Sequence, residues 1–171
     1  MTARLLLLVR HAQAVPAFDD NDRGRVLTAH GRDQARAAGI AIAASGLVPA
    51  TLAIWCSPAA RTVETADLIA QELGEATPVR PVERLYDAAP EGIVELLKNE
   101  GGHTEAIMIV GHNPTMAEFC HLMSGNSAYD SAHDAILLRG YPPATVTAFR
   151  TNTTWADFTP EQVETVFLKV S

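Results

Sequence analysis

Five consecutive residues near the start of the chain, from Leu5 to Val9, are all apolar. A run without polar alternation is typical of a strand that is covered on both faces, as in the middle of a parallel sheet. Shorter apolar stretches return along the chain. The further strands that they predict cover residues 51–55, 78–82, 106–110, 135–138, 145–149 and 163–170, with the last two as an antiparallel pair at an edge.

Helix-capping residues stand between these strands. Thr28 can cap a helix that Gly46 ends. Ser57-Pro58 and Asn113-Pro114 each supply a capping side chain followed by a proline, which favours the first turn of a helix. The four predicted helices run to about residues 45, 73, 99 and 123, and the third begins at about Pro90.

Strands that alternate with helices predict an α/β fold with a mostly parallel central sheet and helices on both faces, which makes three layers. The chain has 171 residues, of which 47% are hydrophobic, so it is long enough for one well-packed domain. No repeat, linker or low-complexity tract divides it. We therefore expect a single domain that covers residues 1–171.

The overall composition excludes several classes of partner. The chain carries 20 acidic and 13 basic residues, a formal charge of −7, and its basic residues are scattered, so nucleic acid is not expected to bind. No stretch approaches the roughly 20 apolar residues of a membrane span. Cys56 and Cys120 are isolated, as expected for reduced thiols in a cytoplasmic protein.

Three predicted strands lead into polar residues that are able to do chemistry. Arg10 and His11 follow the first strand, Arg61 comes soon after the strand at 51–55, and His112 follows the strand at 106–110. In open α/β sheets, ligands bind at the carboxyl ends of the strands. We therefore expect these four residues to share one pocket, although they lie far apart in the sequence.

Such a pocket would suit an anion, and phosphate in particular. Guanidinium groups match phosphate oxygens, and helix N-termini at Pro58 and Pro114 would add partial positive charge. An acidic chain must gather its arginines to bind an anion, and Arg10, Arg25 and Arg61 are the candidates. With the phosphate charge neutralised, a neutral imidazole can attack phosphorus in line. The sequence thus predicts a metal-free phosphohydrolase in which a histidine is phosphorylated and then hydrolysed.

Four short motifs in order along the chain support this prediction. They are Arg10-His11-Ala12, Leu-Thr-x-x-Gly at 27–31, Ser-Pro-x-x-Arg-x-x-x-Thr-Ala at 57–66, and Gly-His-Asn-Pro at 111–114. Together they resemble the histidine phosphatase superfamily, which includes the phosphoglycerate mutases and acid phosphatases. The resemblance covers roughly the first three quarters of the chain. It is closest to the small SixA-type phosphohistidine phosphatases, through Leu85-Tyr86 and the absence of a large inserted cap domain.

The resemblance implies a phosphoglycerate mutase-like fold and a reaction without a cofactor, on a phosphorylated small molecule or a phosphohistidine protein. It makes His11 the nucleophile. It gives phosphate-binding roles to Arg10, Arg25, Arg61 and His112.

Three positions leave this transfer of roles less complete. Arg23 is a near neighbour of Arg25 in the same loop and could take its role. Ala12 stands where the family has glycine, which gives up some freedom in how closely the backbone approaches the phosphate. Gln13 stands where many relatives carry Glu, so a carboxylate role there is lost.

The general acid bears on the substrate. An alcohol is a poor leaving group that needs a positioned acid, whereas an imidazole, with a reference pKa near 6.5, is easily protonated. In relatives that act on esters a carboxylate after the third strand often serves, and Asp87 is the nearest candidate. Asp87 could equally be a turn residue or a helix cap before Pro90. An uncertain acid favours phosphohistidine without excluding esters.

Three other functions remain open from the sequence. The enzyme could be a mutase that returns the phosphoryl group to substrate, or the pocket could bind phosphate without catalysis. A metallohydrolase built on His11 and His112 is a further alternative. The sequence has no HxH or HExxH spacing, and arginines beside these histidines would repel a divalent cation.

Overall fold

The computed structural model describes residues 3–17, 20–74, 77–124 and 139–170. Within these ranges the chain alternates strands and helices, as the sequence predicts. The strands are β1 (Arg4–Arg10), β2 (Leu52–Cys56), β3 (Val79–Pro81), β4 (Ala106–Gly111), β5 (Val146–Thr151) and β6 (Val163–Lys169). The helices are α1 (Ala29–Ser45), α2 (Ala60–Glu72), α3 (Pro90–Glu100) and α4 (Thr115–Ser124), with short 3-10 turns η1 (Asp22–Gly24), η2 (Glu83–Leu85) and η3 (Pro160–Gln162).

The strands form one mixed sheet in the order β3-β2-β4-β1-β5-β6. The first four are mutually parallel, whereas β5 pairs antiparallel with both β1 and β6. The predicted α/β fold with a mostly parallel sheet is therefore confirmed, including the antiparallel pair at an edge. The predicted strand at 135–138 lies outside the described residues.

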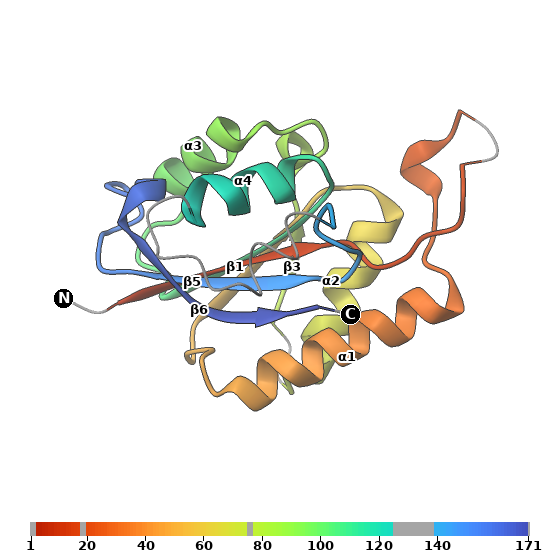
Figure 1. The fold of residues 1–171 in the computed structure, drawn as a ribbon, viewed down its shortest axis with the longest axis horizontal. Helices are drawn as coiled ribbons and strands as arrows, with labels where there is room; N and C mark the ends of the chain where they lie inside the picture. The colour runs from red at the N-terminus through yellow and green to blue at the C-terminus, as the bar shows by residue number, and fades with distance from the viewer. Residues whose placement is uncertain (1–2, 18–19, 75–76, 125–138, 171) are drawn as a thin grey trace.

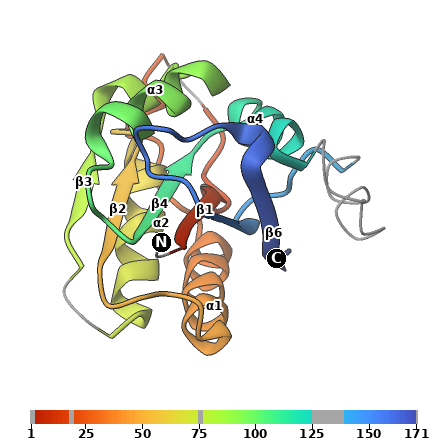
Figure 2. The same ribbon diagram turned by 90° about the vertical axis from the view of Figure 1, so that its left-hand side faces the viewer.

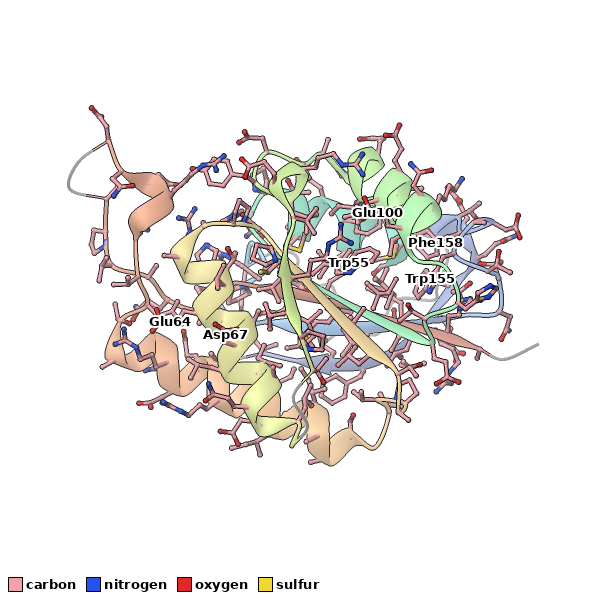
Figure 3. The ribbon with its side chains drawn as sticks, turned by 180° about the vertical axis from the view of Figure 1, so that it is seen from behind. Trp55, Glu64, Asp67, Glu100, Trp155 and Phe158 are labelled. Carbon is pink, nitrogen blue, oxygen red and sulfur yellow. The ribbon has the colours of Figure 1, made fainter. Side chains whose placement is uncertain are left out.

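The sheet separates two cores. Helices α3 and α4 cover one face and α1 and α2 the other (Figure 1), and Figure 2 shows the same three layers from the side. In β1, Leu6 and Leu8 face the first core while Leu5 and Leu7 face the second, which explains the uninterrupted apolar run. The first core also holds the labelled aromatic residues of Figure 3, namely Trp55, Trp155 and Phe158.

Helix α1 begins and ends as its sequence predicts. The Thr28 hydroxyl accepts a hydrogen bond from the Gly31 N–H at 2.9 Å, and Gly46 ends the helix in the left-handed region, with φ of 65°. In the part of the chain that the structure describes, no helix is long and apolar enough to cross a membrane.

Two predicted helix starts are wrong. Helix α2 begins at Ala60 with Ala59 as its cap, two residues beyond the predicted Pro58, because the Ser57 hydroxyl hydrogen-bonds with the ring of His112 instead. Helix α4 begins at Thr115, and the Asn113 amide donates to backbone carbonyls at 140 and 141 instead of capping it. Both side chains make their hydrogen bonds at the carboxyl edge of the sheet, where the candidate residues meet.

Candidate active site

Two histidines lie side by side because of strand register. β1 and β4 pair in parallel with Arg10 opposite Gly111, so His11 and His112 are the next residues on neighbouring strands. The backbone N–H of His11 donates to the Gly111 carbonyl at 3.0 Å. The two ring centroids lie 5.3 Å apart in an edge-on arrangement. The backbone ladder thus brings together His11 and His112, which lie 101 positions apart in the sequence.

The hydrogen bonds of His11 define which of its ring nitrogens carries a proton. Nδ1 lies 2.8 Å from the Ala12 carbonyl oxygen, which can only accept, so Nδ1 carries the hydrogen. Nε2 then has a lone pair, and it accepts from Nε–H of Arg61 at 3.3 Å. The backbone contact fixes the ring with its unprotonated nitrogen toward the arginine.

Arg61 connects the two rings. It is the second residue of α2 and is buried, with 7% of its side chain exposed. Besides its bond to His11, its Nη2 lies 3.2 Å from Nδ1 of His112. Arginine can only donate, so Nδ1 of His112 accepts and its Nε2–H donates to the Ser57 hydroxyl at 2.7 Å. The two imidazoles therefore carry their protons on different nitrogens.

Thr65 ties the backbone that follows His11 to α2. Its hydroxyl accepts from the Ala12 N–H at 3.0 Å and donates to the Arg61 carbonyl at 2.6 Å. The Ala12 methyl, at the position where glycine is expected, is fully buried in a small cluster with Leu27 and Ala35. The backbone beside His11 is thus held by Thr65, which belongs to the motif at 57–66 but for which the sequence alone predicts no role.

Arg10 and Arg25 complete the positive charge of the site. Arg10 donates from Nη1 to the Tyr141 carbonyl at 2.9 Å, while its buried Nε–H has no hydrogen-bond partner among the described residues. Arg25 donates to the Val15 carbonyl at 2.8 Å. Arg23, the alternative candidate for the role of Arg25, pairs instead with Glu83 and lies over the Tyr86 ring. The charge of Arg25, and not that of Arg23, therefore joins those of Arg10 and Arg61 around His11.

Asp22 is the residue that sequence reasoning missed. Its carboxylate accepts from Nη2 of Arg61 at 2.9 Å, from Nη1 of Arg25 at 3.0 Å and from the Tyr86 hydroxyl at 2.7 Å. The Tyr86 hydrogen bond, followed by those of Arg25 and Arg61, holds the pKa of the Asp22 carboxyl well below its usual range. Asp22 is thus a carboxylate anion within the arginine cluster.

Asp87, the predicted acid, is not drawn into this network. It is exposed and follows Tyr86, whose ring lies 5.7 Å from that of His112. Its charge acts on Arg23, whose pKa it helps to raise behind the larger effect of Glu83. Within the described ranges, Asp87 makes no hydrogen bond with either catalytic histidine candidate.

Both histidines are neutral at physiological pH. Burial, opposed by the Ala12 hydrogen bond and reinforced by the charges of Arg61, Arg10 and Arg25, lowers the pKa of His11 to about 4. Burial and then the charge of Arg61 lower the pKa of His112 to about 3. A neutral imidazole can act as a nucleophile, and it does not compete with the arginines for an anion.

We expect nitrogen NMR to show this protonation pattern directly. In a histidine-labelled sample at neutral pH, His11 should carry its hydrogen on Nδ1 and His112 on Nε2. On acidification, each ring should remain neutral down to about pH 5, because burial and neighbouring arginines disfavour the imidazolium. His11→Ala and His112→Ala samples assign the signals.

The same pKa shifts give stability a defined pH dependence. An unfolded chain binds these protons near pH 6.5, whereas the folded chain binds them near 4 and 3. The free energy of unfolding should therefore fall as the pH drops below about 6.5, and level off only below the folded values. A ring that titrates near 6.5 in the folded protein would contradict the described geometry.

The described residues include no group of three or more His, Cys, Asp or Glu side chains that could hold a metal ion. The polar groups that meet at the sheet edge are instead neutral imidazoles, guanidinium groups and one carboxylate. Such a set suits a phosphate or another oxyanion.

Comparison with known proteins gives consistent matches. Residues 6–91 match the family described as the histidine phosphatase superfamily (branch 1). An uncharacterized protein of Mycobacterium tuberculosis (strain H37Rv) is 30% identical over 152 residues, which cover 89% of this chain and 92% of the relative. The solved structure of a protein from Nakamurella multipartitia that is described as a putative phosphohistidine phosphatase SixA has a TM-score of 0.78 at 27% identity, over 99% of this chain and 97% of its own. The protein histidine phosphatase SixA complexed with tungstate shares the fold, with a TM-score of 0.68 at 16% identity over 96% and 95% of the two chains.

Proposed function

Because this chain belongs to the histidine phosphatase superfamily, we propose that it is a phosphatase that carries the phosphoryl group on His11 during each turnover. The observation that supports this proposal most directly is the state of Nε2 of His11. This nitrogen is unprotonated, is fixed by the Ala12 contact and lies against Arg61 in a cluster of arginines.

The reaction has two displacements at phosphorus. The Nε2 lone pair of His11 attacks, the bond from phosphorus to the leaving atom breaks, and the leaving atom takes up a proton. A water molecule then attacks the phosphohistidine, the P–N bond breaks, and inorganic phosphate leaves while the proton of the water passes to the product and solvent. Arg10, Arg25 and Arg61 neutralise the phosphate oxygens in both steps, and His112 lies beside the reacting nitrogen.

We further propose a substrate with a good leaving group, with phosphohistidine in a protein as the first candidate. Asp22, the carboxyl group in the network, is ionised and therefore has no proton to give an alkoxide. Asp87 lies outside the hydrogen-bond network of the two rings. An imidazole leaving group needs little acid assistance, and the structurally similar SixA is a protein histidine phosphatase.

A substrate panel tests this assignment. A phosphohistidine peptide, phosphoramidate, p-nitrophenyl phosphate and an alkyl phosphate are compared at equal concentration by phosphate release. We expect kcat/KM for the P–N substrates and the nitrophenyl ester to exceed that for the alkyl ester by about 10²-fold or more, the usual contribution of a general acid. Equal rates on the alkyl ester would refute the substrate assignment. Transfer of the phosphoryl group to an added acceptor without phosphate release would point to a mutase.

Asp87→Asn supplies the second arm of the panel. Because no described carboxylic acid is placed to protonate an alkoxide, we expect Asp87→Asn to change kcat/KM for both the phosphohistidine peptide and the alkyl ester by less than about 3-fold. A selective loss of alkyl ester hydrolysis would instead identify Asp87 as the acid. A large and equal loss on every substrate would show that Asp87 has another role.

A further inference from the structure

The Asp22 carboxylate is an anion that already binds two of the arginines with which a phosphate would pair. Its Oδ2 contacts Arg61 and its Oδ1 contacts Arg25. Its backbone carbonyl also accepts from Nη1 of Arg61 at 2.7 Å. The pocket is therefore already partly neutralised by a side chain of the same molecule.

Most of the N–H donors of Arg61 are already used and are not free for a phosphate. A guanidinium group has five N–H bonds. Four of those in Arg61 donate to described partners, which are Nε2 of His11, Nδ1 of His112, and the carbonyl and carboxylate oxygens of Asp22. A phosphate that is bound through two or more of these donors must displace at least one partner.

The Asp22 carboxylate is the partner that phosphate should displace. The two imidazoles are neutral, whereas Asp22 carries the same sign of charge as phosphate and would be repelled by it. Its side chain is 43% exposed, so it has a path to solvent. The adjacent Arg23, which pairs with Glu83 and lies 4.2 Å from the Tyr86 ring centre, anchors the segment while the carboxylate turns.

We propose that the Asp22 carboxylate is an internal anion that phosphate displaces from Arg61 and Arg25, and whose return promotes release of the phosphate product. The displacement is inferred from the contacts alone, while the role in product release rests on the proposed function. Three arginines would hold inorganic phosphate tightly after hydrolysis. A competing carboxylate on the same donors weakens that complex and keeps the enzyme turning over.

The test is the equilibrium Kd for inorganic phosphate, measured by calorimetry at neutral pH and fixed ionic strength. Asp22→Asn keeps the shape of the side chain and removes its charge, and we expect its Kd for phosphate to be lower by about 10-fold or more. Asp20→Asn is the matched control, since Asp20 is exposed, lies in the same loop and makes none of these hydrogen bonds. Its Kd should stay within about 2-fold of the parent value.

Tyr86→Phe is the second variant, and it keeps the charge of Asp22 while removing the hydrogen bond that holds it. We expect phosphate to bind about 3-fold more tightly, because the carboxylate is easier to displace. If Asp22→Asn does not fold, as judged by circular dichroism, Tyr86→Phe decides, with tighter binding supporting the proposal and unchanged or weaker binding overturning it.

Unchanged or weaker phosphate binding by folded Asp22→Asn would overturn the proposal, because Asp22 would then only position Arg61. Equal tightening in Asp20→Asn would also overturn it, because a general change of charge would explain the result. Turnover is measured separately, and stronger inhibition of Asp22→Asn by product phosphate supports the release step. If phosphate binds in the expected order but no substrate is hydrolysed, the displacement holds and the proposed function fails.

Discussion

We expect His11→Ala to abolish phosphate release, with a loss of about 10⁴-fold or more in kcat, the size of effect that removal of a nucleophile produces. The reason is that the proposed mechanism has one attacking atom, Nε2 of His11, whose lone pair the Ala12 contact directs toward Arg61. Nδ1 of His112 also has a lone pair that accepts from Arg61, on a ring that Ser57 holds, so the measurement must show that His112 does not take up the phosphoryl group.

The measurement that decides this prediction is a rapid quench with a phosphorus-labelled substrate. Wild-type protein should yield an acid-labile, base-stable phosphoenzyme, and His11→Ala should yield none. His103→Ala is the control, because His103 is exposed and lies near the opposite end of the sheet, beside Arg4. A phosphoenzyme that persists in His11→Ala would remove the proposed mechanism.

Arg61→Ala should lower kcat/KM by about 10³-fold or more, because it removes the group that contacts both rings and that would contact the transferring phosphoryl group. Arg61→Lys should recover little of this loss. A lysine carries the charge but lacks the planar fork that reaches two acceptors at once. The comparison separates simple charge from geometry.

Arg32→Lys is the appropriate control for Arg61→Lys. Arg32 on α1 pairs with Glu64 on α2, and its side chain is much more exposed to solvent than that of Arg61. The same exchange at Arg32 should therefore change kcat/KM by less than about 2-fold. Rates are measured with p-nitrophenyl phosphate. If Arg61→Lys retains more than half of the parent activity, the fork geometry is not needed, and Arg61 contributes only its charge.

The sequence was sufficient to predict the parallel part of the sheet and the residues at its carboxyl edge. The apolar runs of β1 and β4 are unmistakable because both faces of each strand are buried. Once these strands are placed, chain direction alone brings the residues that follow them to one edge. For this reason His11 and His112 could be predicted as neighbours without knowledge of any contact between them.

The residues that escaped prediction are those whose roles depend on tertiary contacts. Ser57 precedes a proline, which local chemistry interprets equally well as a helix cap, and only the position of His112 shows otherwise. Asp22 lies in a polar loop with no periodicity, where its spacing does not distinguish it from Asp20. Its significance arises from two partners in distant parts of the chain, Arg61 and Tyr86, and one within the loop itself, Arg25.

The pairing of β1 with β4 also limits how the chain can change in length. Successive side chains of a strand point to opposite faces. Adding or removing one residue within β1 or within β4 would therefore turn one of the two imidazoles away from the other. A residue added to a surface loop has no such effect, since the ladder fixes the spacing of the rings independently of the loops. Natural variants should therefore differ in loop length while keeping the number of residues in these two strands.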